Sequence, residues 1–248
     1  MSSTMLVAGP KLAVTLVVLT ALAAAVATAG QLGHGRQIAV AAIRAGVQLA
    51  AVSLLIAAIV ASLWATVGFV VVMCAVAAGT SGRRITGGAR GWWAGVPIVA
   101  GSLSVVAGLL LVGLVPLRGI AIIPVAGILI GGAMTATSLA GRRAVDELTG
   151  RRGEVEAALA LGLLPRDAVL LVCRPAAGQA LIPALDQTRT VGLVTLPGAF
   201  VGVLLGGASP LAAGVTQLFV LVGLLAVEVV AVVLTVELVA RGRLRPMP

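Results

Sequence analysis

Charge and aromatic side chains are scarce in this sequence. Only 10% of the 248 residues are charged and 2% are aromatic, and tyrosine does not occur. A soluble domain carries about a quarter charged residues. A globular protein of this length could not cover its core with so little polar surface, so an ordinary soluble domain is excluded.

Other scarce residues exclude several kinds of chemistry. Lys11 is the only lysine and lies outside any GxxxxGK[ST] sequence, so a Walker A loop that binds ATP is not expected. His34 is the only histidine, and none follows the GTSG sequence at 79–82, so a serine nucleophile there lacks a base. Cys74 and Cys173 show no metal-binding spacing. We therefore predict no catalytic residues and no cofactor in this chain, and we cannot name metal ligands.

Long apolar runs are abundant. The hydrophobic fraction is 60% and the mean hydropathy is +1.18, and several runs approach the ~20 residues that a helix needs to cross the hydrocarbon layer. The pattern predicts an all-α, polytopic membrane protein with about seven transmembrane helices. The expected spans cover residues 11–30, 38–61, 64–80, 92–115, 121–140, 191–207 and 213–239.

The net charge of +9 is compatible with nucleic-acid binding, but its distribution favours a membrane. All basic residues except Lys11, Arg44 and Arg118 fall in the first, third and fifth connections or in the tail. Basic connections are typically cytoplasmic. We therefore predict an outside N-terminus, a cytoplasmic C-terminus, membrane lipid as a partner and no nucleic acid.

The first apolar run has a second interpretation. Lys11, an apolar core and small residues at 27–30 resemble a secretory signal with its cleavage site. The apolar core is longer than the usual ~7–15 residues, so we favour a retained helix. Cleavage would leave six spans and the same orientation for the rest.

The fifth connection is the only long polar one. Acidic and basic residues alternate with alanine and leucine over 142–164, and Pro165 then interrupts the helical pattern. This predicts one or two short helices at the cytoplasmic surface. Such helices either rest in the membrane interface or dock into a groove on a partner.

This connection resembles the cytoplasmic coupling loop of ABC-transporter permeases, which reads E-A-A, three residues, G, nine residues and I-x-L-P. The matching residues here are Glu156, Ala157, Ala158, Gly162 and, at the end of 172–175, Pro175, with Arg174 in place of the usual leucine. The resemblance implies that a segment of about 142–175 contacts the ATPase. Glu156 would meet a basic group of that subunit, and Gly162 would allow the turn between two coupling helices.

A wider resemblance covers most of the chain. The sequences IRAGVQLAAV (43–52), IIPVAGILIGGAM (122–134) and the segment 180–210, which includes TVGLVTLPG, are similar to the FetB family of ABC permeases. These are bacterial iron-export-type proteins with plant relatives linked to aluminium tolerance. The resemblance implies one permease domain over 1–248 in the bacterial inner membrane, a homodimer, and a separate ATPase subunit that holds ATP and Mg²⁺.

Two departures from the family leave the substrate open. Gly131-Gly132 stands where asparagine commonly follows the glycine, and Ala199-Phe200 stands where methionines often follow LPG. Methionine sulfur is a soft ligand for some metals. The resemblance therefore implies a metal, or iron, that these residues do not support, and the direction of transport also stays open.

Polar residues inside apolar spans are candidates for a translocation path, because an ionisable group in the membrane is costly and usually faces a cavity. Arg44 and Gln48 lie four residues apart on one helix face, Asp186 precedes the sixth expected span, and Glu228 lies in the last. Arg44 either pairs with Glu228 or snorkels to the surface. Weaker candidates are Pro124, Pro183 and Pro197, which mark either hinges or ordinary kinks.

Two other function classes remain open. A secondary transporter driven by an ion gradient would use Glu228 as a proton relay. A membrane scaffold without transport is disfavoured by charged residues within the spans. A neighbouring ATPase would favour the ABC permease over the secondary transporter.

Overall fold

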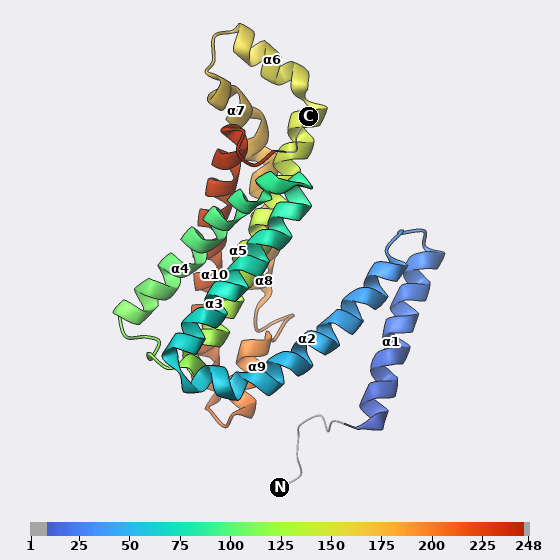
Figure 1. The fold of residues 1–248 in the computed structure, drawn as a ribbon, viewed down its shortest axis with the longest axis vertical. Coiled ribbons are helices and arrows are strands. Elements are labelled where there is room, and N and C mark those ends of the chain that lie inside the picture. Colours follow the sequence, from blue (N-terminus) through green and yellow to red (C-terminus); the bar gives the residue numbers. More distant parts are fainter. Residues whose placement is uncertain (1–8, 246–248) are drawn as a thin grey trace. The chain divides into compact units, whose positions relative to one another are not determined.

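A computed structural model of the chain describes residues 9–245, and all the regular elements in this part are helices (Figure 1). In chain order they are α1 (Pro10–Ala29), α2 (Gly35–Ala61), α3 (Leu63–Thr86), η1 (Ala89–Ala94), α4 (Gly95–Leu111), α5 (Gly119–Gly150), α6 (Arg152–Ala160), α7 (Pro165–Gly178), η2 (Gln179–Leu181), α8 (Ile182–Thr190), α9 (Gly198–Leu205) and α10 (Pro210–Ala240). Backbone contacts divide the chain into two units, Met1–Ile59 and Val60–Pro248.

The first unit is an antiparallel pair formed by α1 and α2 (Figure 1). The two helices approach closely at their shared turn, where a Cβ added to Gly35 would lie 3.1 Å from the Ala24 carbonyl oxygen. Most apolar side chains of this pair are exposed. Apolar residues all around a helix are typical of contact with lipid or with further protein.

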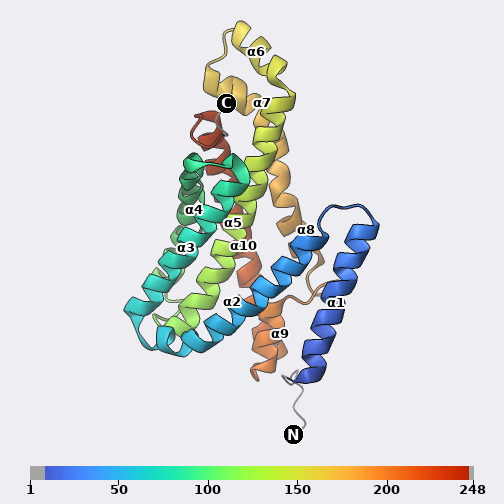
Figure 2. The same ribbon diagram turned by 45° about the vertical axis from the view of Figure 1, so that its right-hand side comes forward.

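The second unit is built around α5 and α10, which lie side by side in both ribbon views (Figures 1 and 2). α5 also packs against α3, α4 and α7. From Ala133 onward its buried face consists of small residues, among them Ala136, Ala140 and Ala144. Small side chains let helix backbones approach closely, which is how helices associate when lipid removes the hydrophobic driving force.

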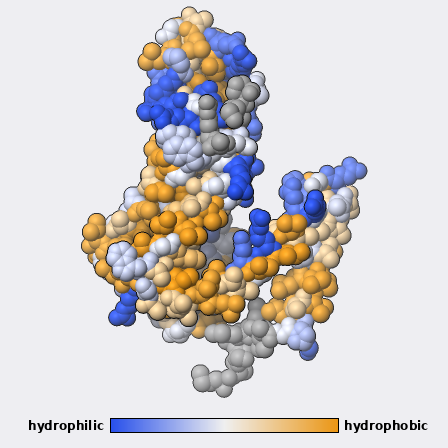
Figure 3. Space-filling model, viewed as in Figure 1, coloured by the Kyte–Doolittle hydropathy of each residue, from blue (hydrophilic) through white to orange (hydrophobic). Residues whose placement is uncertain are grey.

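α5 is too long to lie wholly within a membrane. Its 32 residues correspond to about 48 Å of helix, compared with a hydrocarbon thickness of about 30 Å. The charged residues Arg142, Arg143, Asp146 and Glu147 all lie in the last third of the helix. Hydrophilic residues gather at this end of the unit, around α6 and α7, whereas hydrophobic residues dominate the middle (Figure 3).

Seven helical segments within residues 9–245 are long and apolar enough to cross a membrane, so the predicted number is confirmed. Six of them match the expected spans to within a few residues, except that Leu63–Thr86 and Gly119–Gly150 continue beyond the expected ends at 80 and 140. The sixth prediction was wrong: Pro165–Thr190 takes the place of 191–207. That expected span contains a loop at 191–197 followed by the eight-residue helix α9.

Backbone geometry explains this error. Helix α8 ends at Thr190, Gly192 adopts φ 81°, and Pro197 lacks an N–H group, so the apolar stretch cannot continue as one helix. Eight residues of α9 cover only about 12 Å. The polar residues of α8 do not end the helix, because their side chains find partners within it. Asp186 pairs with Arg189 at 3.5 Å, and the Thr190 hydroxyl donates to the Asp186 carbonyl.

The corrected span also moves three cations. Arg166 and Arg174 now lie inside the sixth candidate span, and Arg189 lies at its far end, rather than all three belonging to the fifth connection. The connection between the fifth and sixth spans shrinks to 151–164. The alternation of connections is unchanged, so the orientation of the termini stays a prediction from charge.

Helix α3 and η1 meet through two glycines. A Cβ added to Gly91 would lie 2.8 Å from the Cα of Gly82. One residue earlier, Ser81 donates to the Met134 carbonyl of α5 at 3.1 Å and accepts a hydrogen bond from Ser138 at 2.9 Å. The GTSG sequence is therefore a packing site within α3, and its serine is engaged in interhelical hydrogen bonds.

Replacing Gly82 with alanine should destabilise the second unit by about 1–3 kcal/mol, because the new methyl group meets backbone that cannot move aside. Gly79 is the matched control, since it lies one turn earlier with open space at its Cβ position. Gly79→Ala should be neutral or stabilising by up to about 1 kcal/mol. Unfolding titrations in mixed detergent micelles measure both, and equal effects would contradict the close contact.

Candidate functional site

The segment predicted to couple to a partner folds as a helical hairpin. Helices α6 and α7 are joined by Leu161–Leu164, where Gly162 has φ 90°, a conformation that favours glycine. The Leu163 N–H donates to the Ala158 carbonyl at 3.1 Å and closes the end of α6. Pro165 starts α7, where its missing N–H costs no helical hydrogen bond.

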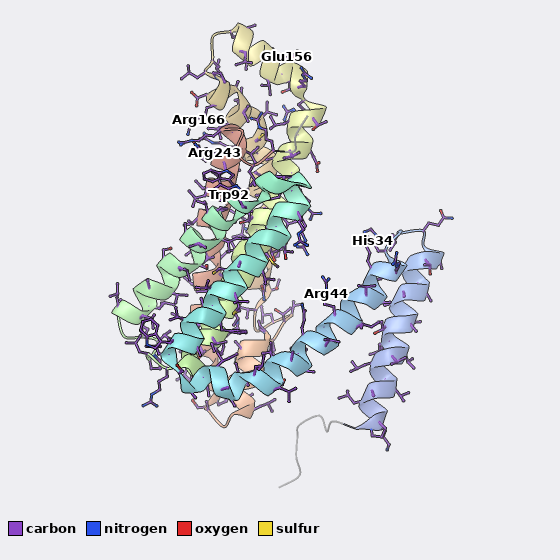
Figure 4. The ribbon with its side chains drawn as sticks, viewed as in Figure 1. His34, Arg44, Trp92, Glu156, Arg166 and Arg243 are labelled. Atoms are coloured by element: carbon purple, nitrogen blue, oxygen red, sulfur yellow. The ribbon has the colours of Figure 1, made fainter. Side chains whose placement is uncertain are left out.

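The other predicted coupling residues divide between surface and core. Glu156 is exposed on α6 and pairs only with Arg152 of the same helix among the described residues, at 2.9 Å. Ala157 is exposed, whereas Ala158 is buried against the rest of the hairpin. Pro175 is exposed inside α7. Glu156 therefore lies on an open surface at the end of the unit (Figure 4).

Arg151 fixes the junction between α5 and α6. Its guanidinium donates to Glu154 at 2.7 Å and reaches Glu147 at 3.5 Å. The hydrogen bond from Arg151 lowers the pKa of the Glu154 carboxyl. The folded chain therefore gains stability from the Glu154 carboxylate at any pH above the ordinary carboxyl pKa. This contribution is lost as the pH falls through the lowered pKa of the folded state.

A two-pronged ion pair joins α7 to α10. The Nε and Nη2 atoms of Arg166 donate to Glu237 Oε1 and Oε2, both at 2.7 Å. Glu237 also accepts from Arg241 at 2.6 Å, and Arg166 donates to Asp167 at 2.8 Å. Planar guanidinium and carboxylate groups in this arrangement fix direction as well as distance.

Two further interactions fasten the same end of the unit. The Cys173 thiol of α7 donates to the Ala144 carbonyl of α5 at 3.4 Å, and Arg143 of α5 donates to the Gln179 amide oxygen at 2.6 Å. The guanidinium of Arg243 lies 4.4 Å from the ring centroid of Trp93. The hairpin is thus attached to both central helices, and Arg243, which follows the end of α10, is attached to η1.

An open cavity of about 270 Å³ lies between α5, α8 and α10. Its polar groups are Thr135, Gln187 and the half-buried carboxylate of Glu228. The remaining lining is apolar or glycine: Ile128, Gly131, Gly132, Leu139, Ala180, Pro183, Ala184 and Leu224. Within residues 9–245, Glu228 makes no hydrogen bond or ion pair, so its charge is left for something else to match.

The structure brings together only part of the predicted path. Glu228 and Pro183 line the cavity. Asp186 lies beside the cavity residue Gln187 but pairs with Arg189 instead. Pro124 is exposed in α5, one turn before Ile128, and Pro197 precedes α9.

The two remaining path candidates belong to the first unit. Arg44 and Gln48 are exposed and lie one turn apart on α2, as their spacing predicts (Figure 4 labels Arg44). Pairing of Arg44 with Glu228 stays a prediction.

Sequence reasoning missed four residues of these sites. Gln187 and Thr135 were overlooked because single uncharged polar residues are common in membrane helices. Arg166 and Glu237 were not singled out, because 71 residues separate the two partners and no local pattern links them. An acidic residue near the end of an apolar span was the available signal for Glu237, since such a charge needs a partner.

The chain matches the family described as "Uncharacterised protein family (UPF0014)" over residues 11–243. It belongs to the UPF0014 family. With seven candidate spans, this UPF0014 chain is a multi-pass membrane protein. No solved structure matches it.

Curated relatives of this UPF0014 chain come from plants and bacteria. It is 40% identical over 167 residues to "UPF0014 membrane protein STAR2" of Oryza sativa subsp. japonica, covering 67% of this chain and 59% of the relative. It is 41% identical over 150 residues to "Protein ALUMINUM SENSITIVE 3" of Arabidopsis thaliana, covering 60% and 55%. It is 32% identical over 125 residues to "Probable iron export permease protein FetB" of Escherichia coli K12, covering 50% and 48%. The chain thus spans little more than half the length of these relatives.

The ion pair between Arg166 and Glu237 should stabilise the folded UPF0014 chain and show a favourable coupling energy, because its geometry is bidentate although it is partly exposed. A double-mutant cycle with Arg166→Ala and Glu237→Ala measures the coupling energy. The control is Arg174→Ala, an exposed α7 residue with no ion pair in the described part of the chain, for which we expect less than about 0.5 kcal/mol. A coupling energy near zero would contradict the role of this pair.

Proposed function

We propose that the chain is the membrane-spanning permease subunit of an ATP-driven ABC transporter. The observation that carries the proposal is the α6–α7 hairpin, which presents Glu156 on an open surface while it is bonded to α5 and α10. A hairpin that served only as a connection would need no such attachment to both central helices. ATP and Mg²⁺ would be held by a separate ATPase subunit, so the chain itself is not an enzyme.

The sequence resemblance and the hairpin geometry support each other. The residues that match the coupling-loop pattern coincide with α6, the turn at Gly162 and most of α7. One relative carries the word "permease" in its name. A membrane orientation with basic connections inside would place α6, the turn at Gly162 and the start of α7 on the cytoplasmic side, where an ATPase can reach them.

The ion pair between α7 and α10 supplies a mechanical path. Movement of the hairpin in a cleft of the ATPase would pull on Glu237 through Arg166, whose two hydrogen bonds fix both distance and direction. Glu228 lies nine residues earlier on the same helix, about 14 Å along its axis. Rotation or tilt of α10 would therefore change the cavity that Glu228 lines.

Assembly and substrate follow from resemblance alone. A half-transporter of this size would function as a homodimer in the bacterial inner membrane, bound to two ATPase subunits. The name of the Escherichia coli relative suggests iron as the transported substrate and export as the direction. Among residues 9–245, however, no group of three or more histidine, cysteine or acidic residues is arranged to hold a metal ion.

A gradient-driven secondary transporter is the second candidate. The observation that favours it is Glu228, a carboxylate without a protein partner in the described chain that lines a cavity between helices. Such groups relay protons in membrane transporters. This function would leave the exposed surface of α6 without a partner ATPase.

Glu156→Lys should prevent co-purification with the neighbouring ATPase, or separate ATP hydrolysis from transport, because it reverses the charge offered to a basic group. Stoichiometry and ATPase rate in detergent measure this outcome. The substitution removes only the exposed pair with Arg152, worth about 0.3–0.5 kcal/mol, so misfolding would not explain a loss.

Asp146→Lys is the matched control. It reverses an exposed carboxylate near the end of α5 that makes no ion pair in the described part of the chain. It should keep the ATPase bound. An equal loss in both variants would indicate a general effect of charge, and a wild-type chain that binds no ATPase would favour the gradient-driven function.

A further inference from the structure

We propose that the cavity between α5, α8 and α10 binds an organic cation carrying a single positive charge, with Glu228 as the matching negative charge. The proposal rests on the function above in one respect, since it names the class of substrate that the permease would carry. The binding itself requires only the second unit of this chain.

The charges around the cavity select a cation. Glu228 is the only ionisable residue in the lining, and no arginine, lysine or histidine faces it there. The nearest ion pair along α8, Asp186 with Arg189, involves residues outside the lining. A carboxylate within a membrane span is costly unless an opposite charge matches it. An anionic ligand would add to this cost, whereas a cation would remove it.

The polar groups are too few for a bare metal ion. Ca²⁺ takes about six to eight oxygen ligands and Mg²⁺ about six, part of them water, whereas the lining offers one carboxylate, from Glu228, beside the Gln187 amide and the Thr135 hydroxyl. Thr135 already donates to the Gly131 carbonyl at 3.0 Å. The lining also holds no cysteine, histidine or methionine for softer metals. One negative charge would leave a divalent ion with an unmatched charge in an apolar surrounding.

The shape and the walls fit an ion with an apolar body. Leucine, isoleucine, alanine and proline side chains form most of the lining. A volume of about 270 Å³ is close to the lower end of small-molecule sites, about 300 Å³. A tetraalkylammonium ion combines one delocalised charge with alkyl groups that contact such walls. The site thus matches both the charge and the apolar surface of such an ion.

Two adjacent glycines of α5 shape the site. A Cβ added to Gly132 would lie 3.0 Å from Glu228 Oε1, so this glycine leaves room for the carboxylate. A Cβ added to Gly131 would meet nothing within 4 Å, although Gly131 lines the cavity. A larger side chain at 131 can therefore enter the cavity without a clash in the helix. This difference makes Gly131 suitable for blocking the site.

Binding of radiolabelled tetraethylammonium to the purified full-length chain in detergent tests the proposal. Wild type should bind saturably, and Glu228→Gln should weaken binding about tenfold or more, because it removes the matching charge but keeps the shape. Gly131→Leu should abolish binding by filling the cavity. Gly202→Leu in α9, where the Cβ position is also open, is the matched control and should bind as wild type.

Three results would overturn the inference. They are no saturable binding to a monodisperse wild-type chain, binding that is unchanged in Glu228→Gln, or Mn²⁺ binding by electron paramagnetic resonance that depends on Glu228 and competes with tetraethylammonium. Should Gly131→Leu fail to fold, the comparison of Glu228→Gln with Gly202→Leu decides. The binding assay contains no ATPase, so it tests this inference alone. Cation binding together with a failure to co-purify any ATPase would contradict only the ATP-driven function. An ATPase complex without cation binding would contradict only this inference.

Discussion

The close contact between α5 and α10 is the constraint on which the second unit depends. Alanines on α5 and the glycine at 132 let the two helices approach, since a Cβ added to Gly132 would lie 2.5 Å from the Leu224 side chain of α10. This contact places Glu228 against α5, in a cavity that α8 closes on a third side. It also sets the two helix ends side by side at the position where α7 bonds to both.

Most of the fold could be predicted from composition, because a helix that crosses lipid must be about 20 apolar residues long. The error at 191–207 shows the limit of that rule. Hydropathy counted Val191 to Gly207 as a span, but it cannot register that Gly192 adopts a positive φ or that Pro197 lacks an N–H group. It likewise underrated 165–190, where Arg174, Asp186 and Arg189 concealed a continuous run of helical turns.

The hairpin and the cavity differ in how far apart their determinants lie in the sequence, and this decides how well each could be predicted. The hairpin was predictable because its determinants are local: Gly162 makes the turn, Pro165 begins α7, and Glu156 lies within five residues of its own partner. The cavity and the ion pair were not, because their partners come from distant segments. Glu237 meets Arg166 across 71 residues, and Glu228 meets Gln187 only through the packing of α8 beside α10. A single sequence gives no register for such contacts.

Length explains why the hairpin and the cavity belong to one mechanical system. α5 and α10 have 32 and 31 residues, so each extends beyond a hydrocarbon layer of about 30 Å. Their extensions carry the charges that hold α7, while their apolar parts enclose Glu228. If α5 and α10 ended at the membrane surface, a loop would lie between the residues that hold α7 and the residues that line the cavity. Such a loop would take up a movement of the hairpin before it reached the cavity. In the proposed function α5 and α10 would carry both sets of residues, so a displacement of α7 would shift the cavity walls for as long as Arg166 holds Glu237.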